Sequence, residues 1–286
     1  MATDETVSPT RTGGPRPAGL VRRRTLMGGL AAAIAAPAVL AGCSDISSVS
    51  PARSGATRPR ADCVPAASMG TYDNLAGARL VYEVNDRATR FRIEPGFAGQ
   101  FEAWLAEWNA LTGTTTRTLG TYGSWLADDG ACDSWHHSGR AFDVARVLDA
   151  AGEVVSCHYD LWGADPDEGR LPAYWALAAG LHAHFAYVLT YLYDDAHANH
   201  IHVDNGISGS GLSGFSGRSR VQIQAVQAIC THLWSVGTPT TGSWDPATRA
   251  SVRTVLDRLG LRGNLTATDV WQGFLRGSIT HWADGR

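Results

Sequence analysis

The segment that most strongly constrains the fold of this chain is His197-Ala198-Asn199-His200-Ile201-His202-Val203-Asp204. In a β-strand, successive side chains point to opposite faces. His200 and His202 would therefore share one face, and Ile201 and Val203 the other. The pattern predicts a strand whose apolar face packs on a core while its polar face carries two imidazoles.

A second stretch supplies the other half of a site. It reads Ser134-Trp135-His136-His137-Ser138-Gly139-Arg140-Ala141-Phe142-Asp143, with a Ser-Gly turn between an imidazole and a carboxylate. Two imidazoles and a carboxylate are the donor set of a catalytic zinc site that keeps one position open. We predict that His136, Asp143 and His202 bind Zn²⁺. His200 would be the catalytic group beside them that handles protons.

Composition narrows the function classes. The chain has 286 residues and is 44% hydrophobic, which is enough for a substantial core. All 24 basic residues are Arg, so Schiff-base and lysine-nucleophile chemistry are excluded. The formal net charge is −3, and the first 42 residues carry more Arg than acid, so the remainder is more acidic still. We therefore expect no nucleic-acid partner.

The start of the chain predicts export. Residues 1–42 contain Arg22-Arg23-Arg24 and then an apolar run that is too short for a transmembrane span of about 20 residues. The run ends at Leu40-Ala41-Gly42-Cys43, which resembles a lipobox, so cleavage would leave Cys43 lipidated. Ordinary signal cleavage and an uncleaved anchor are the alternatives. We expect an exported protein, held to the outer face of the cytoplasmic membrane or the cell wall through a lipid anchor at Cys43. Residues 43–66 would be its tether.

The other four cysteines predict two disulfides, because an even number is typical of exported proteins. They are Cys63, Cys132, Cys157 and Cys230. Of the three possible pairings we prefer Cys132–Cys157 with Cys63–Cys230. The first would close a loop around the His136 stretch.

Hydrophobic periodicity predicts the remaining elements. Apolar residues at helical spacing indicate a helix from Phe97 to Leu111, ended by Gly113, and a second over 172–184. Strands are expected over 78–84, 89–93, 185–193 and 200–204. Residues 206–218 have the composition of a Gly/Ser linker, and three helical stripes follow it.

The predicted fold class is α+β. A small antiparallel sheet with flanking helices would carry the zinc site over residues 67–205. The linker 206–218 would join it to a small three-helix domain at 219–286.

The two histidine-containing stretches together resemble a known superfamily. Ser134, His136, Gly139, Ala141 and Asp143 match the Ser-x-His-x-x-Gly-x-Ala-x-Asp signature of the zinc D-alanyl-D-alanine peptidase, lysostaphin-type and hedgehog superfamily. The stretch His197–Asp204 resembles its His-x-His motif in the form found in the extensin-like C-terminal branch. Gly120-Thr121-Tyr122 is similar to that branch's Gly-x-Tyr. Residues 242–248 and 265–271 resemble a three-helix peptidoglycan-binding domain.

The resemblance implies a zinc metallopeptidase that acts on peptidoglycan. It assigns His136, Asp143 and His202 as zinc ligands and His200 as base or transition-state stabiliser. His137 is an alternative to His136 as ligand, and Ser134, His197 and Asp204 could orient the ligands.

Two departures keep a non-catalytic, zinc-containing peptidoglycan-binding lipoprotein as the alternative. Asn199 stands where the carboxypeptidase branch has a catalytic Glu. Neither Arg117 nor Arg140 is in a convincing position to bind a substrate carboxylate.

Overall fold

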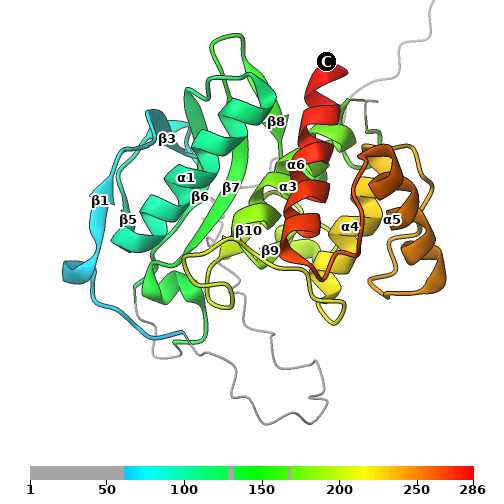
Figure 1. The fold of residues 1–286 in the computed structure, drawn as a ribbon. Helices are drawn as coiled ribbons and strands as arrows, with labels where there is room; N and C mark the ends of the chain where they lie inside the picture. Colours follow the sequence, from blue (N-terminus) through cyan, green and yellow to red (C-terminus); the bar gives the residue numbers. More distant parts are fainter. Residues whose placement is uncertain (1–60, 128–131, 167–168) are drawn as a thin grey trace, which may run out of the picture. The chain divides into compact units, whose positions relative to one another are not determined.

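The computed structural model describes residues 61–127, 132–166 and 169–286. The predicted export signal (1–42), the lipid anchor at Cys43 and most of the tether (43–66) lie outside these residues. Mixed α and β structure is confirmed (Figure 1). Among the described residues, no helix has both the length and the apolar character needed to cross a bilayer.

The larger sheet has eight strands in the order β2-β3-β6-β7-β10-β9, with β4 paired to β3 and β8 to β7. Its strands are β2 (Asn74–Leu75), β3 (Ala78–Tyr82), β4 (Arg87–Ala88), β6 (Thr118–Gly123), β7 (Ala141–Leu148), β8 (Glu153–Ser156), β9 (Tyr187–Leu189) and β10 (Ile201–Asp204). A separate antiparallel pair joins β1 (Gly70–Tyr72) to β5 (Phe91–Ile93).

The expectation of a small antiparallel sheet needs correction, because β3 and β6 run parallel. Parallel neighbours require a crossover connection, and the chain between these two strands includes the long helix α1 (Pro95–Thr112). The other pairings in this sheet, β7 with β10 among them, are antiparallel.

Helix α1 confirms the predicted amphipathic segment and covers one face of the sheet. It begins where the Glu94 side chain accepts hydrogen bonds from two backbone N–H groups, and it ends at Gly113, whose φ is 65°. Its apolar side is buried, and the rings of Phe101 and Phe142 lie 4.5 Å apart, which packs α1 directly on β7. This contact anchors the strand that carries Asp143.

The other helices complete the core. They are the short α2 (Tyr159–Trp162), then α3 (Arg170–His184), α4 (Arg220–His232), α5 (Pro246–Arg258) and α6 (Thr268–Asp284). Short 3₁₀ helices occupy η1 (Ala66–Ser68), η2 (Trp135–Ser138) and η3 (Asp195–His197). Helix α6 lies against both α1 and α3, and α4 lies against α3 (Figure 1).

The segment expected to be a linker is packed rather than extended. Ser213 and Phe215 are buried, and the indole N–H of Trp271 donates to the Ser213 hydroxyl at 2.8 Å. The Gln272 amide donates to the carbonyl oxygens of Ala183 and Ser213 at 2.9 Å. Whether residues 219–286 fold independently stays a prediction, but their helices share one hydrophobic core with α1 and α3.

The preferred disulfide pairing was wrong. The structure joins Cys63 to Cys132, whereas Cys157 and Cys230 are free and buried. The reason is spatial. The backbone at Cys63 and Val64 runs beside η2, where the Val64 N–H donates to the carbonyl of His137 at 3.0 Å. Cys157 and Cys230 instead belong to the hydrophobic core.

Candidate metal centre

Strand pairing brings two of the predicted ligands together. In the antiparallel register of β7 and β10, His202 lies directly opposite Asp143. Such cross-strand neighbours have Cβ atoms about 4.5–5.5 Å apart on the same face. The predicted strand over 200–204 is confirmed as β10, which begins one residue later at Ile201.

The third residue, His136, comes from η2. The Ser134 hydroxyl accepts from the His136 N–H at 3.3 Å and so caps this short helix. Gly139 ends it with a φ of 65°, a conformation that glycine adopts without strain. Its N–H donates to the carbonyl of His136 at 3.0 Å. The serine and glycine of the first stretch therefore hold the backbone that presents His136.

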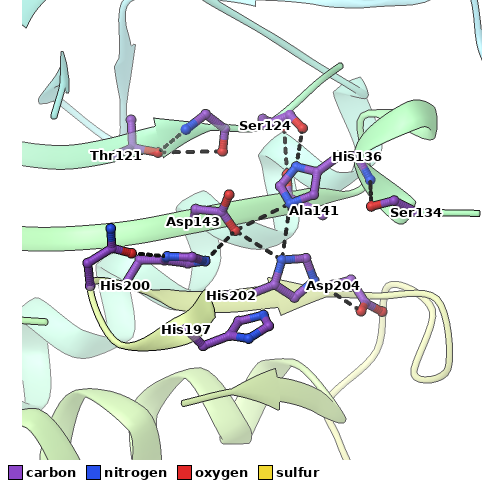
Figure 2. Close-up of polar contacts among 12 residues, drawn as sticks. Thr121, Ser124, Ser134, His136, Ala141, Asp143, His197, His200, His202 and Asp204 are labelled. Carbon is purple, nitrogen blue, oxygen red and sulfur yellow. Dashed lines mark hydrogen bonds and ion pairs between the residues drawn. The ribbon is translucent and has the colours of Figure 1, made fainter. Parts of the chain in front are cut away.

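The three side chains converge on one point (Figure 2). The Oδ1 atom of Asp143 lies 2.9 Å from Nδ1 of His202 and 3.3 Å from Nε2 of His136. The two nitrogens are 3.1 Å apart. Ligand atoms about 2.0–2.1 Å from one tetrahedral metal ion lie about 3.3 Å from one another, so this spacing fits a shared ion.

The outer contacts of both imidazoles explain why a cation fits here. Nδ1 of His136 bonds to the carbonyl oxygen of Ser124, which can only accept, so Nε2 presents a lone pair to the centre. Oδ2 of Asp204 lies 3.4 Å from Nε2 of His202, which favours a hydrogen there and a lone pair on Nδ1. Two lone pairs and a carboxylate oxygen thus face one point. The buried group of His136, Asp143 and His202 could bind a metal ion.

Electrostatics favours an ionised carboxylate at the centre. Burial alone would raise the pKa of the Asp143 carboxyl. The neighbouring imidazoles of His136, His200 and His202 outweigh burial and hold that pKa well below its usual range.

His200 lies at the more open edge of the cluster. Its Nε2 is 3.5 Å from Oδ1 of Asp143, and the side chains of His200 and Asp143 are 13% and 15% exposed, against 4% for His202. The Asn199 amide oxygen accepts from Nδ1 at 2.7 Å, which leaves a lone pair on Nε2. Burial lowers the pKa of His200 to about 4, although Asp143 opposes this shift.

His197 packs against the ring of His200 and so supports the site. Its Nδ1 lies 2.6 Å from Oδ1 of Asp194, and its ring centroid is 5.2 Å from that of His200. His137 does not join the group, because its Nδ1 is directed toward Asp133 at 4.0 Å. The structure thus favours His136 over His137 as the residue of η2 that faces the centre.

Neither suggested substrate-binding arginine lies at the centre. The Arg140 side chain donates to the side-chain and backbone oxygens of Asn205 and stacks over Trp135. Arg117 immediately precedes β6, at the end of that strand away from Gly123, the residue that pairs with Asp143.

Sequence reasoning missed a charged group on the sheet that carries the centre. Glu83 is 8% exposed and accepts from Nε2 of His158 at 3.0 Å and from Nε of Arg146 at 2.8 Å. Gly120 opposes Arg146 in the sheet, and a Cβ atom there would lie 2.4 Å from Glu83 Oε2. The glycine of the Gly-x-Tyr motif was the available signal, since it keeps space for this ion pair.

Comparison of the chain with protein-family models, with curated proteins and with solved structures gave no match.

Proposed function

We propose that this chain is a zinc-dependent hydrolase that cleaves amide bonds in peptidoglycan peptides at the cell envelope. The observation that carries the proposal is the convergence of the acceptor atoms of His136, Asp143 and His202 beside a further imidazole. The paired Ser-x-His-x-x-Gly-x-Ala-x-Asp and His-x-His motifs support the same assignment.

Different residues of the chain would bind the metal, accept a proton and orient the ligands. His136, Asp143 and His202 would hold the ion, and zinc when bound polarises a carbonyl and activates water near neutral pH. His200 presents its Nε2 lone pair at the exposed edge and would accept the proton there. Ser124 and Asp204 orient the two ligand imidazoles.

The envelope setting belongs to the same proposal. Export through residues 1–42 and a lipid anchor at Cys43 would keep the site near the wall. Helices α4, α5 and α6 would form the small three-helix domain that binds peptidoglycan and so raises its local concentration. Fractionation tests the anchor: Cys43→Ser should move the protein from the membrane fraction to the soluble one.

Metal analysis joined to peptidoglycan digestion tests the activity. Wild-type protein should carry about one zinc ion per chain, as a single three-ligand site requires, and should release new amino termini from purified peptidoglycan. His202→Ala should lose both zinc and activity while its circular dichroism stays unchanged. His281→Ala, an exposed position on α6, is the matched control and should retain both.

The alternative is a non-catalytic, zinc-containing peptidoglycan-binding lipoprotein. Asn199 and the engagement of Arg140 by Asn205 favour it. Under this alternative, wild-type protein would bind zinc and co-sediment with peptidoglycan but release no termini. A folded wild type with neither zinc nor activity would contradict both functions.

A further inference from the structure

Residues 61–65 contact the backbone that presents His136, and none of the roles above uses them. Val64 is the point of contact. Its N–H donates to the carbonyl of His137 in η2 at 3.0 Å, and its carbonyl accepts from the indole N–H of Trp125 at 2.9 Å. Val64 therefore joins η2 to the segment that follows β6.

The segment that follows β6 also holds His136 directly. Ser124 and Leu126 flank Trp125 in the chain, and both contact His136. The carbonyl of Ser124 bonds to Nδ1 of the His136 ring (Figure 2), and the Leu126 N–H donates to the His136 carbonyl at 3.1 Å. The ring orientation and the backbone position of His136 thus both depend on this segment, and the indole of Trp125 connects it to Val64.

A disulfide and a close packing contact keep Val64 in this place. Cys63, the residue before it, is bonded to Cys132, which lies shortly before η2 begins. Met69 lies against the residue that ends η2, because a Cβ atom at Gly139 would be 2.5 Å from the Met69 sulfur. A hydrogen bond in a partly exposed segment contributes little by itself, so the covalent link is what keeps the partners of Val64 within reach.

We propose that Val64 and Trp125 are positioning residues that hold His136 for metal binding. The Cys63–Cys132 disulfide keeps Val64 in place, so its oxidation state sets the affinity of the centre for zinc. This inference rests on the metal-binding part of the proposed function and does not need hydrolysis. A dithiol that reduces the disulfide supplies two electrons and two protons: the S–S bond breaks, two thiols form, and the dithiol itself becomes a disulfide. The backbone around His136 would then be held less firmly, and zinc would bind more weakly.

Thermodynamic linkage gives the proposal a quantitative form. If reduction weakens zinc binding by some factor, zinc must make the disulfide harder to reduce by the same factor. We expect a factor of about five or more, the lower end of couplings between two sites. For a two-electron couple, such a factor lowers the reduction potential by at least about 20 mV. A disulfide that only stabilises the fold would show no such reciprocal effect.

A redox titration of the full chain tests this linkage. Oxidised and reduced dithiothreitol set the potential, and a chelator buffer fixes the free zinc concentration, because thiols also bind this ion. With the centre saturated, the midpoint of the Cys63–Cys132 pair should be lower than without zinc by at least about 20 mV. His202→Ala, which lacks a ligand, should show no difference. A midpoint that is equal or higher with zinc, in a wild type that binds zinc, would overturn the inference alone.

Trp125→Phe tests the hydrogen bond itself, because it removes the indole N–H and keeps an aromatic ring. Chelator competition on oxidised protein should show zinc affinity lowered about fivefold or more. Trp234→Phe is the matched control, since it also loses an indole hydrogen bond, to Ser278 at 2.8 Å. It should lower the thermal midpoint and leave zinc affinity unchanged. Wild-type affinity in Trp125→Phe, or equal losses in both variants, would overturn the positioning role. An oxidised, folded wild type that binds no zinc would overturn the proposed function and this inference with it.

Discussion

At the scale of single residues, Asp204 shows how the cluster depends on groups that do not touch its centre. Its carboxylate is almost fully buried and faces Nε2 of His202, and it also accepts from the Gly206 N–H at 2.9 Å. It therefore fixes both the ring orientation and the end of β10. Such partners of metal ligands are worth about 10- to 100-fold in metal affinity.

We predict that Asp204→Asn weakens zinc binding by about 10- to 100-fold while the fold is kept. Competition with a chromophoric chelator measures this directly. Asp195→Asn, an exposed carboxylate in η3, is the control and should bind zinc as wild type does. Equal affinities in the two variants would contradict the orienting role of Asp204.

Gly120 provides a prediction about stability. A Cβ atom there would meet Glu83 Oε2 at 2.4 Å and Arg146 Cβ at 3.2 Å. Gly120→Ala must therefore displace a buried carboxylate from its partners, and we expect it to lower the free energy of unfolding by about 1–3 kcal/mol. Gly99 is exposed in α1 with open space around it, so Gly99→Ala should raise stability by about 0.5–1 kcal/mol. Urea titrations of both variants give the comparison, and equal effects would contradict it.

A residue of the site could be predicted from the sequence when it belongs to a local pattern, and could not when its contacts are with other elements. His136 and Asp143 lie within one short stretch, and His202 lies on an alternating strand, so local pattern brought all three into one hypothesis. Ser124 and Glu83 were missed because their partners lie in other elements: the Ser124 carbonyl contacts His136 of η2, and Glu83 contacts Arg146 of β7 and His158. A serine carbonyl or a lone glutamate carries no local signal of such a partner.

At the scale of elements, a charged contact holds α6 against the rest of the core. Glu107 on α1 lies 2.6 Å from Nε2 of His184 on α3, and it also bonds to Arg276 on α6. Beside it, the rings of Trp108 and Trp282 stack at 5.7 Å. Three helices from both halves of the chain therefore meet at one carboxylate.

This contact predicts a pH-dependent contribution to stability. The hydrogen bond from His184 is the main cause that lowers the pKa of Glu107, aided by Arg276 against burial. A carboxyl whose pKa is depressed on folding stabilises the protein fully above its unfolded pKa of about 4.3. This stabilisation is lost as the pH falls through the folded value.

Glu107→Gln should therefore cost about 1.5–3 kcal/mol at pH 7, because hydrogen bonds to charged groups have that magnitude, and the cost should be smaller at pH 3. Urea midpoints across this pH range measure the difference from wild type. Glu153→Gln, at an exposed position on β8, is the matched control and should change the urea midpoint at pH 7 little. A cost for Glu107→Gln that persists undiminished at pH 3 would contradict the assignment.

Elements with local signals were predictable, and their partners were not. The end of α1 follows from Gly113, and its buried side follows from aromatic spacing. The parallel pairing of β3 with β6 could not be read from either strand, because it depends on the path of the intervening helix. The pattern of Gly and Ser over 206–218 likewise indicated a linker, although hydrogen bonds from Trp271 and Gln272 pack that segment.

At the scale of the whole molecule, the shared core predicts cooperative unfolding. The buried residues of α4 and α6 belong to the same hydrophobic cluster as those of α1 and α3. We expect residues 61–286 to unfold in one transition, with far-ultraviolet circular dichroism and tryptophan fluorescence giving the same midpoint. Two separated transitions would instead support an independent helical domain at 219–286.

The disulfide between Cys63 and Cys132 affects how this protein should be produced. It closes a loop with a sequence separation of 69 residues. It also holds the backbone at Cys63 and Val64 beside η2, the short helix that presents His136. A chain produced in a reducing cytosol would lack this disulfide, and such a crosslink contributes about 2–4 kcal/mol to the free energy of unfolding. Under the proposed function, preparations from a reducing cytosol should show lower metal occupancy than secreted or oxidatively refolded material. The oxidation state of one cysteine pair should therefore be measured before any negative metal analysis is accepted.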